Sequence, residues 1–168
     1  MFEADGGTRQ VHRLRQPGGD FVSTTDAPRR VIVGVDDSQN AAEAARWAAD
    51  EAAEHGFELH LIYGLNFPAQ AALLSPVPFE ETRTRAFKLG DELLARVSEP
   101  LAAAHPGLTI TSEVTEIGAA EALVERSKDA RLVVTGSRSH GGFAGLLLGS
   151  VSLKVATHAH CPVVIVRD

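Results

Sequence analysis

Alternation between short apolar runs and helical stretches is the feature that most constrains this chain. Residues 31–35 form a β-branched run of the kind that is buried on both faces of a parallel sheet. The alanine-rich stretch 41–54 has helical character, and residues 58–63 return to a strand-like composition. The alternation continues with expected strands at 108–114, 132–135 and 161–166 and expected helices at 87–101, 119–128 and 150–157.

This order predicts an α/β fold. Each short strand must cross over a helix to reach the next, so we expect one doubly wound, parallel five-stranded sheet with helices on both faces, a Rossmann-like architecture. Ligands of such sheets bind beyond the carboxyl ends of the strands, where the strand order reverses. Trp47 lies in the middle of the first helix, and we expect it to pack against the sheet.

The length of 168 residues suits one core. Residues 1–28 mix Gly, Ser, Thr and Pro with charges and lack apolar periodicity, which predicts a flexible extension before a domain at 29–168. The one cysteine, Cys161, excludes an intrachain disulfide, and neither a secretory signal nor an apolar run of about 20 residues is visible. We therefore expect a cytoplasmic protein that does not enter membranes. The net charge of -6 disfavours nucleic acid as a partner.

Residues 136–150 carry the strongest functional signal. This glycine-rich segment follows a strand and opens a helix. Glycines let a backbone approach a ligand closely, and the free N–H groups at a helix start bind phosphate, here at Gly149 and Ser150. The alternative is that the glycines only shape a tight loop. The segment is not a P-loop, because no Gly-Lys-Ser or Gly-Lys-Thr follows the glycines.

The spacing of this segment resembles that of ATP-binding universal stress proteins. Their motif has Gly, two residues, Gly, nine residues, and then Gly followed by Ser or Thr; Gly136, Ser139, Gly149 and Ser150 fall on these positions, with Ser139 replacing the second glycine. The run 141–152 and the ending 161–167 also resemble that family, so the resemblance covers residues 30–168. Arg131 departs from it, because the family usually has Asp there.

The resemblance implies a Rossmann-like fold of the adenine nucleotide alpha hydrolase type and a site for ATP. Asp36 would contact the nucleoside, Leu61 would contact adenine through its backbone, and Arg138 either reaches the phosphates or is solvated. The full set of implied nucleotide-binding residues is Gly34, Val35, Asp36, Leu61, Gly136, Arg138, Ser139, Gly149, Ser150 and Val151.

The implied function is that of an adenine-nucleotide-binding stress-response regulator. It would act as a homodimer paired through the last strand, residues 163–166, with Mg²⁺ or Mn²⁺ accompanying the phosphates. Two alternatives stay open: a nucleotide-free dimer scaffold, suggested by Ser139, and a slow ATP hydrolase, although no catalytic base is identifiable.

Other polar residues have structural interpretations. Asp36 and Asp37 are adjacent at a strand end and point in different directions, so we expect no catalytic pair. His158, His160 and Cys161 lack a second cluster of Cys or His, so we expect a turn and not a metal site.

Overall fold

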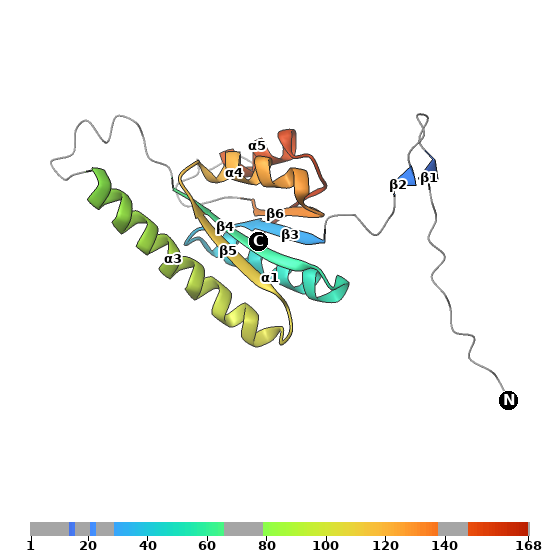
Figure 1. The fold of residues 1–168 in the computed structure, drawn as a ribbon, viewed down its shortest axis with the longest axis horizontal. Coiled ribbons are helices and arrows are strands. Elements are labelled where there is room, and N and C mark those ends of the chain that lie inside the picture. Colours follow the sequence, from blue (N-terminus) through green and yellow to red (C-terminus); the bar gives the residue numbers. More distant parts are fainter. Residues whose placement is uncertain (1–13, 16–20, 23–28, 66–78, 138–147, 168) are drawn as a thin grey trace.

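The structure is a computed structural model that describes residues 14–15, 21–22, 29–65, 79–137 and 148–167. Its centre is a five-stranded parallel sheet with the strand order β5-β4-β3-β6-β7 (Figure 1). Four helices within the described residues connect these strands, which confirms the predicted α/β class. In chain order, the elements of the domain are β3 (Arg30–Gly34), α1 (Gln39–His55), β4 (Glu58–Gly64), α3 (Phe79–Ala104), β5 (Ile110–Thr115), α4 (Ala119–Arg126), a 3-10 turn (Ser127–Asp129), β6 (Leu132–Gly136), α5 (Ser150–His158) and β7 (Val163–Val166).

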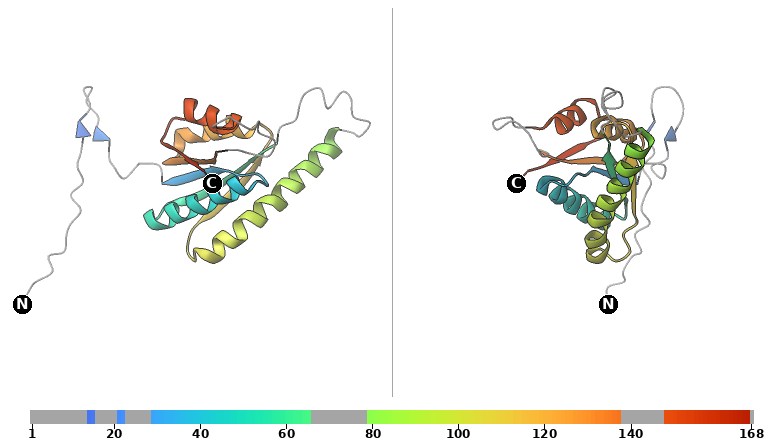
Figure 2. Two further views of the ribbon diagram at one scale, coloured as in Figure 1. Left: turned by 180° about the vertical axis from the view of Figure 1, so that it is seen from behind. Right: turned by 90° about the vertical axis from the view of Figure 1, so that its left-hand side faces the viewer.

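The helices cover both faces of the sheet. Helices α1 and α3 pack on one face, where Val31 and Val33 join the buried alanines of α1 and Leu94 of α3. Helices α4 and α5 cover the other face, where Ile32 packs with Leu123 of α4 and Val155 of α5. The two layers are visible above and below the sheet in Figure 1 and again from behind in Figure 2. Because successive residues of a strand point to opposite faces, the alternate members of β3 serve both cores.

Helix α1 shows how the local sequence sets the packing. Ser38 caps its start by accepting the Ala41 N–H, and Gly56 ends it in a left-handed conformation with φ 64°. Six alanines at helical spacing are buried against the sheet: Ala41, Ala44, Ala45, Ala48, Ala49 and Ala52. The expectation for Trp47 is wrong. Its side chain is 37% exposed, because position 47 lies off this alanine stripe.

Helix α3 is longer than the sequence predicts, since it begins at Phe79 and not near residue 87. Its first turns carry Glu80, Glu81 and exposed residues, so apolar periodicity does not mark them. None of the described helices combines the length and the apolar composition needed to cross a membrane.

Within residues 1–28 the structure describes two short strands. They are β1 (Leu14–Arg15) and β2 (Phe21–Val22), which pair antiparallel. The other residues of this predicted extension lie outside the described residues.

Candidate functional site

A cavity of about 240 Å³ opens at the carboxyl ends of the central strands. It lies where the strand order reverses, because β3 pairs with β4 on one side and with β6 on the other. This switch point is where doubly wound sheets bind ligands. The lining residues come from the ends of β3, β4 and β6 and from the first turns of α1, α4 and α5: Gly34, Val35, Asp36, Ala41, Tyr63, Gly64, Ala119, Thr135, Gly136, Gly149, Val151 and Ser152.

Two lining glycines allow helices to approach the strand ends. A Cβ atom on Gly64 would lie 2.2 Å from the backbone N of Ala119, and one on Gly136 would lie 2.9 Å from the carbonyl carbon of Asn40. These distances are shorter than real Cβ contacts, so both positions require glycine for packing. The starts of α4 and α1 therefore form walls of the cavity.

The start of α5 forms the third wall. Gly149 is its N-cap, with φ -74° and ψ 168°, and no side chain caps the helix. The first N–H groups of a helix have no partner within it, and they carry its positive dipole end. Gly149 and Val151 line the cavity, and Ser150 between them is exposed. This wall therefore offers backbone donors and partial positive charge.

Ser137 holds the start of α5 against the sheet. Its side chain is 2% exposed, and its N–H donates to the Val166 carbonyl at 2.8 Å. Its carbonyl accepts the Gly149 N–H at 2.7 Å and the Ser152 hydroxyl at 3.1 Å, and its Oγ accepts from Asn40 Nδ2 at 3.4 Å. One residue thus links β6, β7, α5 and α1, which fixes the donors of α5 relative to the strand ends.

Asp36 supplies the carboxylate of the site. It is half-buried two residues after the end of β3, and its Oδ1 accepts the Ser38 N–H at 2.9 Å. Within the described residues its Oδ2 has no hydrogen bond, so it can accept one from a ligand.

Most of the residues singled out by sequence converge on this cavity. Gly34, Val35, Asp36, Gly136, Gly149 and Val151 line it, and Ser150 adjoins it. Leu61 does not line it: this side chain is fully buried in the core beside α1, because β4 continues to Gly64 before it ends. Arg138 and Ser139 lie outside the described residues.

Sequence reasoning missed several lining residues. Tyr63 and Gly64 take the place expected for Leu61, and Ala41, Ala119, Thr135 and Ser152 complete the walls. Their shared signal is position, since each lies at the last residues of a strand or the first residues of a helix.

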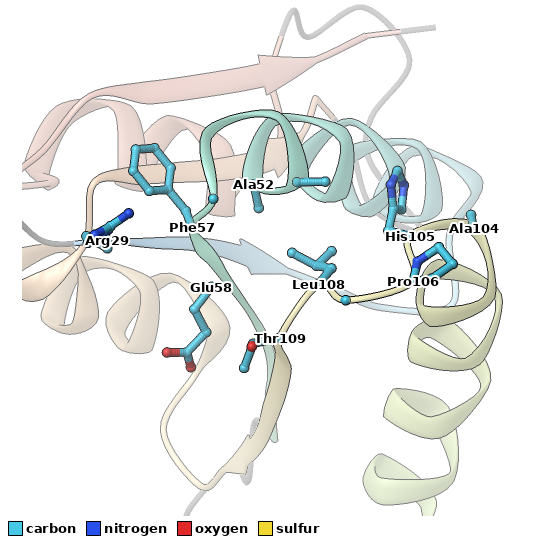
Figure 3. A pocket seen from close by; sticks show the side chains of 12 residues that line it. Arg29, Ala52, Phe57, Glu58, Ala104, His105, Pro106, Leu108 and Thr109 are labelled. Atoms are coloured by element: carbon cyan, nitrogen blue, oxygen red, sulfur yellow. The ribbon is translucent and has the colours of Figure 1, made fainter. Parts of the chain in front are cut away.

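A larger hollow of about 720 Å³ lies at the opposite end of the sheet, around Arg29, Phe57 and His105 (Figure 3). Figure 3 shows the Phe57 ring and the Glu58 carboxylate on opposite sides of the strand. That carboxylate accepts from Thr111 at 2.7 Å and from Arg30 at 3.3 Å, and His105 Nε2 lies 3.1 Å from Asp50 Oδ1. Helices α1 and α3 end here with their negative dipole ends. The hollow is therefore a poor phosphate site, and the smaller cavity is the better candidate.

A polar cluster on β4 and β5 has a structural arrangement. The Thr111 hydroxyl donates to Glu58, so its oxygen accepts from His60 Nδ1 at 2.8 Å, and His60 Nε2 lies 3.8 Å from Glu113. Burial lowers the pKa of His60, although Glu113 opposes this shift. Glu113 is itself bound by Arg126 at 3.0 and 3.2 Å. Each polar side chain of this cluster therefore has a partner within the protein, and the bonds join β5 to β4 and to the end of α4.

His158, His160 and Cys161, which precede β7, each have a different structural role. The His160 N–H donates to Ser127 Oγ at 2.9 Å, and His158 is exposed on the last turn of α5. Cys161 is half-buried, and burial raises the pKa of its thiol. Such a thiol behaves as a small apolar side chain.

Comparison with known proteins assigns a family to this arrangement. The family model described as "Universal stress protein family" matches residues 28–167. Universal stress protein Rv2623 of Mycobacterium tuberculosis is 37% identical over 150 residues, which are 88% of this chain and 50% of that protein. A universal stress protein of Mycolicibacterium smegmatis is 34% identical over 149 residues, covering 89% of this chain and 49% of that protein. The chain thus spans about half the length of these relatives.

Solved structures agree on the fold. Universal stress protein UspA from Lactobacillus plantarum superposes with a TM-score of 0.69 at 22% identity, covering 84% of this chain and 99% of that one. A universal stress protein crystallised in complex with cAMP superposes with a TM-score of 0.59 at 27% identity, covering 84% of this chain and 98% of that one.

Proposed function

The chain belongs to the universal stress protein family, and from this premise we propose that it is a stress-response regulator that binds ATP in the cavity at the ends of β3, β4 and β6. One observation carries the proposal: an uncapped helix start, a carboxylate with a free oxygen and a small-residue cavity meet at the switch point of the sheet. The 27%-identical relative solved with cAMP supports an adenine nucleotide as the ligand.

The chemistry of each wall suggests how the nucleotide lies. The phosphates take the backbone N–H groups at Ser150 and Val151, because negative charge is favoured at a helix start and the Gly149 N–H is already bonded to the Ser137 carbonyl. A ribose hydroxyl donates to Asp36 Oδ2. Arg138 and Ser139 stay candidates for the phosphates, with Mg²⁺ or Mn²⁺ shared among the phosphate oxygens.

The proposed assembly is a homodimer paired through β7. This strand is one edge of the sheet, and each of its four residues is half-buried in the single chain. An apolar edge strand offers unpaired backbone groups to a second chain, and natural proteins cover or pair such edges. A second copy of β7 would provide that cover.

Isothermal titration with ATP tests the site through Gly149→Val. The branched side chain would stand at the mouth of the helix start, so we expect a loss of ATP affinity of at least about tenfold. The backbone angles of Gly149 lie in the extended region that valine adopts readily, so the fold should be retained, as circular dichroism would report.

Leu153→Ala is the matched control, because Leu153 is 54% exposed on the same helix and does not line the cavity. Its ATP affinity should equal that of the wild type. Unchanged affinity in a folded Gly149→Val protein would move the phosphates elsewhere, and a wild type that binds no adenine nucleotide would refute the proposed function.

A further inference from the structure

Thr135 contains the buried polar atom that the fold does not use. It is the fourth residue of β6, it lines the cavity, and its side chain is 3% exposed. Among the described residues, its Oγ1 is the one buried side-chain oxygen or nitrogen without a hydrogen-bond partner. Buried polar atoms nearly always have partners, so an exception beside a cavity calls for a physical reason.

The residues around Thr135 explain why its hydroxyl has no hydrogen-bond partner within the described part of the protein. The nearby Ser152 hydroxyl bonds the carbonyls of Ser137 and Gly149, and Ser137 Oγ accepts from Asn40. Thr135 shares its sheet face with Val133, whose cluster with Ile32, Leu123 and Val155 is apolar. Valine has nearly the same shape as threonine and would fill this place without an unpaired hydroxyl. Packing alone therefore does not account for the hydroxyl.

We propose that the Thr135 hydroxyl hydrogen-bonds the nucleoside part of the bound nucleotide and helps to select it, an inference that rests on the proposed function. The two ends of the cavity differ in exposure, and this indicates which part of the nucleotide lies beside Thr135. Its phosphate-binding end is open, since Ser150 is exposed and Gly149 is half-buried, whereas Thr135 lies at a buried wall. Charged phosphates belong at the open end and the less hydrated nucleoside at the buried end. A hydroxyl both donates and accepts, so it can pair with a base nitrogen or a ribose hydroxyl.

Three ligands distinguish a nucleoside contact from a phosphate contact. Adenosine, AMP and ATP share the nucleoside and differ only in phosphates, and each is titrated into the wild type, Thr135→Val and Thr135→Ser. We expect Thr135→Val to weaken all three by the same factor of about ten, because it leaves a buried ligand atom unpaired. Thr135→Ser, which keeps the hydroxyl, should bind each of them nearly as well as the wild type.

A ligand-free measurement accompanies the titrations. Thr135→Val should melt at a higher temperature than the wild type without nucleotide, because it removes an unpaired buried hydroxyl. Thr109→Val is the control, since Thr109 is exposed at the other end of the sheet, and its nucleotide affinity should not change. Thr135→Ser and Thr135→Ala repeat the comparison, because this pair differs only in the hydroxyl: the alanine variant should melt higher than the serine variant, and a lower melting temperature would refute the unpaired hydroxyl on which the inference rests.

Three other results of the titrations are possible, and each would refute one specific claim. Equal affinities for the wild type and Thr135→Val, with the wild type binding, refute the role of Thr135 and leave the proposed function standing. A loss seen with AMP and ATP but not with adenosine assigns the hydroxyl to a phosphate and refutes the nucleoside contact. A wild type that binds none of the three ligands refutes the proposed function and this inference with it.

Discussion

Gly64→Ala should destabilise the domain by pushing α4 away from the sheet. Gly64 ends β4, and a Cβ atom added there would lie 2.2 Å from Ala119 N, 2.6 Å from Ala119 Cα and 2.9 Å from the carbonyl carbon of Gly118. All three are backbone atoms, so no side-chain rotation relieves the clash. The start of α4 would have to move by about 1 Å to restore an ordinary contact distance of about 3.4 Å.

The magnitude follows from two opposing effects. Overpacking that shifts the backbone costs roughly 1 to 3 kcal/mol, and the short distances place this site near the upper value. Alanine restricts the unfolded chain more than glycine does, which returns about 0.4 to 1 kcal/mol. We therefore expect the free energy of unfolding to fall by about 2 kcal/mol.

Urea unfolding followed by circular dichroism measures this change, with Gly118→Ala as the matched control. Gly118 lies next to the same contact, but a Cβ atom there would meet only Glu121 Oε2 at 3.0 Å, at the end of an exposed, flexible side chain, and its φ of -58° suits alanine. Gly118 is the N-cap of α4, where alanine is less favourable than glycine, so the stability of this control should fall by at most about 1 kcal/mol. Equal stabilities for Gly64→Ala and Gly118→Ala would refute the close approach of α4 to β4.

Two further predictions concern pH and assembly. Burial lowers the pKa of His60 from its ordinary value of 6.5, so below about pH 6.5 the unfolded chain binds more protons than the folded one. The free energy of unfolding therefore decreases as the pH is lowered through this range. His60→Asn keeps a donor toward Thr111 without titrating, and its urea midpoint should lose less over that range; a parallel loss would contradict this role. In β7, Pro162 and Val166 direct their carbonyls to β6, so the N–H of Ile165 faces the open edge. Ile165→Pro should convert a light-scattering dimer into a folded monomer, and a wild type that is monomeric at micromolar concentration would refute pairing through β7.

The sheet and its helices could be predicted because their signals are local. β-branched runs marked β3 and β6, and alanine spacing marked α1. The start of α3 could not, because its exposed first turns have no apolar stripe to detect. The expectation for Trp47 rested on its position in the middle of α1, but the alanines hold the face of that helix that packs on the sheet.

The cavity was predictable in position and only partly in composition. Gly136, Gly149 and Asp36 follow strands or open helices, which the sequence shows. Leu61 was proposed from the resemblance alone, and its side chain is in the core, whereas β4 reaches the cavity through Tyr63 and Gly64. The Asn40 to Ser137 hydrogen bond joins residues 97 positions apart, and the missing partner of Thr135 depends on what every neighbour bonds. Neither can be deduced before the chain is folded.

The central claim is that the smaller cavity, and not the larger hollow, holds an adenine nucleotide. Amide chemical-shift mapping by NMR during titration with ATP tests it most directly, because it reports both places at once. If the nucleotide binds in the smaller cavity, saturable shifts should cluster at Gly34 to Asp36, Gly64, Gly136 and Gly149 to Ser152, with none around Gly56, His105 and Thr109. Shifts confined to the second group, or no saturable shifts at all, would contradict it.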